Sequence, residues 1–187
     1  MYGLKALGYA TVFSAMAFGA SAQGLHGDGA AHGHGHGANG MGHDEVNMPG
    51  LRGENVTEAE SLEMQVMFQN FTTLSRTVDN LSNGIRTVTT SSDPEVLAAL
   101  TSHIAGMINR VETRDNPLVF IQSPTLDIFF ERGDEITTEI EVTDAGIVVT
   151  QTADDPDLIE ALHTHAAEVS DMASRGMMSV HERMMGQ

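Results

Sequence analysis

An internal repeat constrains the fold of this chain more than any other sequence feature. With an offset of 62 residues, residues 84–107 align with residues 146–169. The matched positions include Gly84 with Gly146, Asp93 with Asp155, and His103 with His165. A repeat of this length indicates two copies of one supersecondary unit that share a core. The fold must therefore be built from two similar halves.

Each copy has the pattern of a β-hairpin followed by a helix. Asn83-Gly84 is a two-residue hairpin signal, and residues 144–146 are a looser form of it. The residues after each turn are rich in Val, Ile and Thr, which favour strands. An Asp-Pro pair then opens a helix, because Asp caps free backbone N–H groups and Pro is tolerated at the first helical position. Apolar residues follow at helical spacing: Val96, Leu97, Leu100, Ile104, Met107 and Val111 in the first copy, and Leu158, Ile159, Leu162, Ala166, Val169 and Met172 in the second.

A helical pattern also precedes each hairpin. One covers residues 58–76, and a shorter one opens at Ser123-Pro124. The repeating unit is thus helix–strand–strand–helix. We predict a single α+β domain over residues 56–187, with repeats at about 56–118 and 119–187. Its four strands should form a mainly antiparallel sheet with helices packed on it, and a pseudo-two-fold axis should relate the halves.

Residues 1–22 have the features of an export signal. Lys5 gives the only early charge, residues 6–19 are apolar and small, and Ala20-Ser21-Ala22 fits the cleavage rule. The apolar stretch is too short and too rich in Ala and Gly for a transmembrane helix. We therefore expect a periplasmic or secreted protein with no membrane attachment after cleavage. The alternative is a retained N-terminal anchor.

Charge and the absence of cysteine exclude several kinds of partner and site. Nine Lys and Arg stand against 26 Asp and Glu, a formal net charge of −17. Nucleic acid and anionic membrane surfaces both require clustered basic residues, so neither is expected as a partner. The chain has no Cys, which excludes disulfides, thiolate metal sites, iron–sulfur clusters, covalently attached haem and Cys nucleophiles.

Residues 23–55 form a Gly-rich block with little to bury, which predicts a disordered tail. Its five histidines fall within 18 residues: His26, His32, His34, His36 and His43. In a flexible chain several imidazoles can bind one ion, and neutral imidazole suits copper, zinc and nickel. We expect this tail to capture metal ions. The alternative is a low-complexity linker that binds them incidentally.

The repeat places His103 and His165 at equivalent positions of its two helices. Each lies at the edge of the apolar face, about 60° from the Leu three residues before it. Near a pseudo-two-fold axis, equivalent residues face each other. A centre with two imidazoles, with Met172 as a further ligand, would suit copper or a non-covalently bound haem b. The alternative is two half-buried core histidines that bond to separate carbonyl groups.

The C-terminal 16 residues combine thioethers with one imidazole. They contain Met172, Met177, Met178, His181, Met184 and Met185. On a helix, His181 lies one turn from a Met on either side, in the sets 177–181–184 and 178–181–185. Thioether with imidazole selects Cu(I), whereas zinc and nickel do not require Met. The alternatives are a helix that closes the core and a Met-rich face for a flexible partner.

Motifs of common enzymes are missing. The chain has no G-x-S-x-G, P-loop or H-E-x-x-H motif. We therefore expect a binding protein rather than an enzyme. The alternatives are a metal-dependent enzyme or redox protein with its site at the repeat interface, and a structural or partner-binding domain.

Two resemblances bear on function. The order Gly-Ile, Val-Thr, Asp-Pro and His, carried by residues 84–103 and 146–165, resembles a family of small exported bacterial proteins without an established activity, so no catalytic residues carry over. The His- and Met-rich segments, residues 23–50 and the last 16, resemble those of periplasmic copper-handling proteins. The second resemblance implies metal capture, delivery or tolerance, with copper preferred over zinc, nickel or haem b. Metal ions, another periplasmic metal-handling protein and a second copy of the chain are the expected partners.

Overall fold

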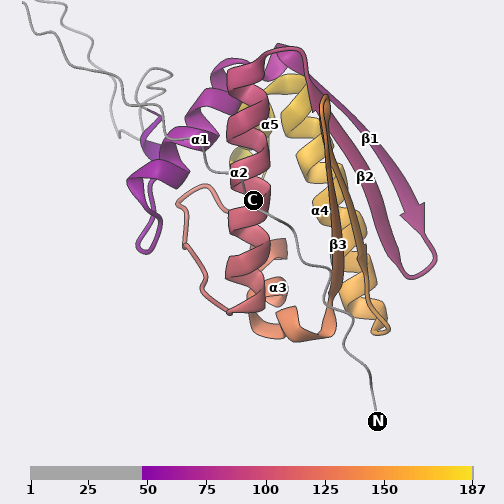
Figure 1. The fold of residues 1–187 in the computed structure, drawn as a ribbon. Helices are drawn as coiled ribbons and strands as arrows, with labels where there is room; N and C mark the ends of the chain where they lie inside the picture. Colours follow the sequence, from indigo (N-terminus) through magenta and orange to yellow (C-terminus); the bar gives the residue numbers. More distant parts are fainter. Residues whose placement is uncertain (1–47, 187) are drawn as a thin grey trace, which may run out of the picture. The chain divides into compact units, whose positions relative to one another are not determined.

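The computed structural model describes residues 48–186 (Figure 1). The predicted export signal and the five tail histidines therefore lie outside the described residues. Among the described residues, no helix combines the length and apolar character needed to cross a bilayer.

The described part of the chain folds as a four-stranded antiparallel sheet with helices packed on it. The strands are β1 (Leu74–Leu81), β2 (Gly84–Ser91), β3 (Thr137–Thr143) and β4 (Gly146–Thr152), in the order β1-β2-β4-β3. The helices are α1 (Glu58–Gln69), α2 (Pro94–Glu112), α3 (Asp127–Arg132), α4 (Pro156–Arg175) and α5 (Met177–Met185). The predicted α+β fold is confirmed.

The register of the central strand pair shows how the two halves are related. β2 and β4 pair so that Thr87 lies opposite Val149. These two residues are 62 positions apart and thus occupy the same place in the repeat. A pseudo-two-fold axis therefore passes through the pair, as the repeat predicted. Equivalent backbone hydrogen bonds follow at its two ends, from Ala153 N–H to the Asn83 carbonyl and from Ser91 N–H to that of Ala145.

Helices α2 and α4 cover the same face of the sheet. Ile85 packs with Leu158 and Leu162 of α4, while Ile147 packs with Leu100 of α2. Because side chains alternate along a strand, the register of β2 and β4 places Ile85 and Ile147 on one face. Two apolar clusters thus form side by side, one under each helix.

Both long helices begin as the Asp-Pro pairs predicted. The Asp93 carboxylate accepts a hydrogen bond of 2.8 Å from Glu95 N–H, and the Asp155 carboxylate accepts one of 2.9 Å from Asp157 N–H. Proline follows each Asp at the first helical position. The repeated sequence therefore fixes the direction in which each helix leaves the sheet.

The helix before the first hairpin is shorter than predicted. α1 ends at Gln69, a 3-10 turn covers Phe71–Thr73, and Leu74 and Arg76 belong to β1. The prediction of a helix to residue 76 is wrong at its end. Side chains from Leu74 to Asp79 alternate between half-buried and exposed, which is the period of a strand. Phe71 and Leu74 are three residues apart, which is a helical spacing. The alternation from Leu74 onwards is the feature that distinguishes the strand.

Residues 48–55 pack against the rest of the folded part. Leu51 is only 2% exposed, and Gly53 forms an isolated antiparallel bridge with Val119. The folded part that the structure describes thus begins before residue 56.

Candidate functional site

Gly176 separates the C-terminal helix α5 from α4. This residue has a positive φ of 60°, and a Cβ on it would lie 2.7 Å from the Phe71 ring. Val180 and Ser179 of α5 are buried, and the Ser179 hydroxyl donates to the carbonyl of Gly176, the N-cap of the same helix, at 2.8 Å. One face of α5 is therefore fixed against the body and the other faces solvent.

The exposed face of α5 carries thioethers on both sides of an imidazole. Met178 is 66% exposed and Met185 is 76% exposed, and His181 between them is also exposed. Their spacings of three and four residues place all three on one stripe of the helix. We call Met178, His181 and Met185 the α5 stripe. All members of the set 178–181–185 are exposed, whereas the set 177–181–184 includes the half-buried Met177.

The other C-terminal methionines divide between surface and interior. Met184 is exposed, whereas Met172 on α4 and Met177 at the start of α5 are half-buried. Among residues 48–186, no three His, Asp or Glu side chains come together to hold a metal ion. The α5 stripe is a linear arrangement on a helix surface, and binding would require its flexible side chains to turn towards one ion.

The two repeat-related histidines are both half-buried, His103 on α2 and His165 on α4. Burial lowers the pKa of His103, an effect that the nearby Glu63 and Glu60 partly oppose. Burial lowers the pKa of His165 to about 4, with smaller contributions from the positive charges of Arg76, Arg183 and His103. Both imidazoles are therefore neutral at pH 7, which is the form that binds metals.

The immediate surroundings of these two histidines differ. The ring of His165 contacts the Phe129 ring edge-on, with centroids 5.7 Å apart. The Nδ1 atom of His103 is buried without a hydrogen-bond partner. His103 lies next to Ser102, which donates to the Glu63 carboxylate of α1 at 2.5 Å. The assignment of these histidines as copper or haem ligands stays a prediction.

A third histidine of α4 has a structural role that the sequence did not reveal. His163 donates through Nε2 to the carbonyl oxygens of Gly84, at 2.8 Å, and Leu81, at 3.1 Å. It thereby ties α4 to the turn between β1 and β2. The equivalent residue in the first repeat is Thr101, so the repeat itself carries no signal for this contact.

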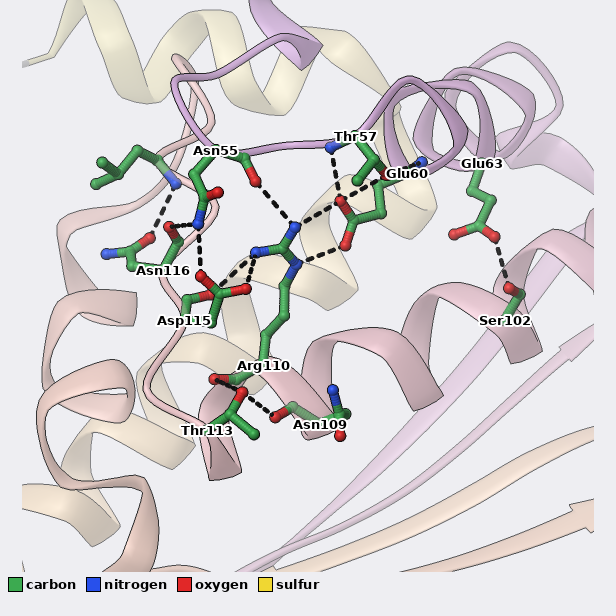
Figure 2. Close-up of polar contacts among 11 residues, drawn as sticks. Asn55, Thr57, Glu60, Glu63, Ser102, Asn109, Arg110, Thr113, Asp115 and Asn116 are labelled. Atoms are coloured by element: carbon green, nitrogen blue, oxygen red, sulfur yellow. Dashed lines mark hydrogen bonds and ion pairs between the residues drawn. The ribbon is translucent and has the colours of Figure 1, made fainter.

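Arg110 forms the most extensive buried ionic network of the described residues (Figure 2). It is 8% exposed and donates to both Glu60 carboxylate oxygens, at 2.5 and 2.9 Å. It also donates to the Asp115 carboxylate at 2.7 Å and to the Asn55 carbonyl at 2.9 Å. The bond from Arg110 lowers the pKa of Glu60 to about 2. Because each charge is paired, this network braces the segment before α1 against the end of α2.

The best-formed hollows of the described surface offer no histidine. One of about 370 Å³ lies between α4 and α5, where Arg175 bonds to Asp171 and Glu182, and Arg183 lies 3.9 Å from Glu168. The other, of about 270 Å³, is lined by residues between 118 and 127. In the first hollow two arginines face three carboxylates, and the Oε2 atom of Glu168 is buried without a hydrogen-bond partner in the described part of the chain.

No protein family matches the chain, and no curated protein or solved structure is significantly similar to it.

Proposed function

We propose that this protein binds copper, with Cu(I) as the preferred form, and serves its capture, delivery or tolerance outside the cytoplasm. The observation that carries the proposal is the α5 stripe, where two strongly exposed thioethers flank an exposed imidazole. Soft thioethers with imidazole form a ligand set that selects Cu(I). The histidines of residues 23–47 would add a second set of ligands.

The exposure of these methionines argues against a role in packing. A core methionine fills irregular space between helices and is shielded from water. Met178 and Met185 are instead among the most exposed apolar side chains of the described residues. Their sulfur atoms are accessible to an ion, and their flexible side chains can reach one from adjacent turns of α5.

A linear, surface-exposed ligand set suits a protein that passes its ion on. Two or three ligands on one helix leave coordination positions of the ion open for ligands from a protein that delivers the ion or from one that receives it. A partner in the same compartment could then exchange the ion directly. The haem-binding and enzymatic alternatives would place the function at His103 and His165 instead, and they stay predictions.

The test replaces the thioethers without changing the size of the side chains. We expect the double variant Met178→Leu, Met185→Leu to keep its melting temperature, because these residues are exposed and Leu has a similar volume. Its Cu(I) affinity, measured by competition with a chromogenic Cu(I) chelator, should fall at least tenfold. The half-buried Met67, which packs under α2, provides the matched control Met67→Leu. That variant should keep the Cu(I) affinity of the unchanged protein.

A second measurement locates the ion on the helix. In the full chain with ¹³C-labelled Met methyl groups, Ag(I), a stand-in for Cu(I) that does not change oxidation state, should shift the signals of Met178 and Met185. Signals that stay in place, or an unchanged Cu(I) affinity of the double variant, would rule out the α5 stripe as the copper site. The stripe would then be better explained as a surface for a flexible partner.

A further inference from the structure

Strand β3 is an open edge of the sheet, and among residues 48–186 its backbone pairs with β4 alone. In an antiparallel pair, alternate residues direct their N–H and C=O groups away from the partner strand, so those of β3 point to the free edge. Every residue of β3 except Thr138 is exposed, whereas exposed and half-buried residues alternate along most of β1 at the other edge. β3 is thus the edge that is more accessible to a further strand.

The apolar side chains of β3 are exposed although they lie on the helix-covered face of the sheet. Ile140 is directly opposite Val149 of β4, and Val142 is directly opposite Ile147. Directly opposite residues share a face, and both β4 residues belong to the apolar cluster that contains Leu100 of α2. Ile140 is nevertheless 43% exposed and Val142 is 62% exposed. The helices therefore leave this end of the face open.

The equivalent strand of the first repeat is better covered. Val78 of β1 lies 62 positions before Ile140, and it is half-buried against the apolar cluster under α4. α4 packs on β1 and β2, whereas α2 packs on β2 and β4. The next position on the same face is Asn80 in β1 but Val142 in β3. The second half thus has more apolar surface at its edge than the first half and less helix over it.

The other face of β3 carries two carboxylates that lack a basic neighbour. Glu139 and Glu141 are exposed, and neither forms an ion pair within the described part of the chain. The strand beside them, β4, has no basic residue, and Glu141 lies opposite Val148. In the first half the equivalent carboxylate does have a partner, because Asp79 lies opposite Arg86 with 3.7 Å between their charged atoms. A basic residue is therefore missing on either side of β3.

The charges of β3 determine which strand fits beside it. An antiparallel pair of two β3 strands centred on Ile140 would place Glu139 of each copy opposite Glu141 of the other, and like charges directly opposite are destabilising. A strand with Lys or Arg at these places would supply what Arg86 supplies to Asp79. We propose that β3 is the docking edge for an extended segment of another protein in which apolar residues alternate with Lys or Arg, bound by addition of a strand to the sheet. The α5 stripe is not part of this edge.

The probe is a short capped peptide in which Val alternates with Lys, and its binding is followed through the ¹⁵N amide signals of the full chain. We expect this peptide to bind and its largest shifts to fall in β3. Two control peptides isolate the cause. One has Glu in place of Lys, and the other keeps Lys but carries N-methyl groups along its backbone, which preserve the charge and remove the N–H donors. Each control peptide should bind at least tenfold more weakly.

The double variant Glu139→Lys, Glu141→Lys reverses the charge of the edge, and Glu112→Lys, Glu160→Lys is its matched control. The two control residues are exposed on α2 and α4, and their replacement changes the net charge by the same amount. We expect the β3 variant to bind the Lys peptide at least tenfold more weakly than the control variant does. The β3 variant should bind the Glu peptide instead.

The proposal is overturned if the Lys peptide does not bind, if its shifts lie outside β3, or if the N-methylated peptide binds equally well. Equal weakening in the two double variants would attribute binding to net charge and would also overturn it. Sedimentation of the unchanged protein tests the other occupant, since a dimer that Val142→Lys dissociates would assign the edge to a second copy and overturn the proposal. The shift measurement needs no variant, so it stays decisive if the β3 variant does not fold.

Discussion

A Cβ atom on Gly84 would lie 1.9 Å from the carbonyl oxygen of Gln151 on the neighbouring strand. The repeat reproduces this relationship, since a Cβ on Gly146 would lie 2.2 Å from the carbonyl oxygen of Thr89. Both approaches occur where β2 and β4 pair across the pseudo-two-fold axis. The central strand pair therefore closes only because each copy of the repeat begins with glycine.

We predict that Gly84→Ala destabilises the protein by about 3 kcal/mol, because the new methyl group meets backbone and Gly84 has a φ of 155°. Thermal unfolding measures this loss as a fall of roughly 6–12 °C in a domain of this size. Gly106→Ala is the matched control, since a Cβ at this helical position meets nothing within 4 Å. It should raise the stability by about 0.5–1 kcal/mol. Equal effects of the two changes would contradict the close approach at Gly84.

The pair of Glu60 and Arg110 should make stability depend on acid pH. The pKa of Glu60 is lowered to about 2 in the folded protein from an ordinary value of 4.5. Its contribution to the free energy of unfolding is therefore complete above pH 4.5 and is lost as the pH falls towards 2. At neutral pH, Glu60→Gln should cost about 3–5 kcal/mol, because it leaves the buried guanidinium of Arg110 without its main partner.

The control for this prediction is Glu58→Gln, in the exposed first turn of the same helix. We expect it to change the unfolding free energy by less than about 0.5 kcal/mol. Chemical denaturation at pH 7 and pH 3 compares the two variants. The difference between Glu60→Gln and the unchanged protein should shrink at pH 3, and a constant difference would show that the ion pair does not supply it.

His163 should contribute to stability without any metal ion. His163→Leu keeps much of the side-chain volume but leaves the carbonyls of Leu81 and Gly84 without this donor. We predict a loss of about 1–3 kcal/mol in thermal unfolding of the metal-free protein. The exposed Thr164, the next residue of α4, provides the control Thr164→Leu, which should leave stability within about 0.5 kcal/mol. A stable His163→Leu variant would mean that these hydrogen bonds are replaced by water at no cost.

Deletion of residues 23–47 should separate metal capture by the tail from the stability of the fold. This segment is rich in Gly and His and has little apolar surface to bury. The deletion stops before Met48 and Leu51, which are buried against the body. We predict an unchanged melting temperature without metal and fewer Cu or Zn ions bound per chain, measured by elemental analysis. A full-length variant with the five tail histidines changed to Asn should lose the same number of bound ions. A melting temperature of the deletion variant several degrees below that of the unchanged protein would contradict the prediction of a disordered tail.

Local sequence patterns predicted most of the secondary structure. The hairpin signal at Asn83-Gly84 and the caps at Asp93 and Asp155 act within a few residues, so their effects could be derived directly. The end of α1 could not, because Phe71 and Leu74 continue a helical spacing, whereas Leu74, Arg76 and Val78 have the alternation of a strand. Pairing of β1 with β2 decided in favour of the strand.

The candidate sites depended more on tertiary contacts. The sequence identified the thioethers and imidazole of α5, but only the packing of Val180 and Ser179 shows that Met178 and Met185 point away from the core. The half-buried position of Arg76 on the helix-covered face had no sequence signal, because a strand places alternate residues on either face and the covered face depends on where α4 packs.

Residue types and short spacings were enough to predict the repeat, the hairpins, the starts of the long helices and the absence of cysteine chemistry. Long-range packing set which strands meet at the centre, which arginines pair with carboxylates, and which methionines face solvent. Thr87 and Val149 are 62 residues apart, and Glu60 and Arg110 are 50 residues apart. Contacts over such separations arise only when the two halves close on a shared core, since local propensity does not specify a partner so distant along the chain.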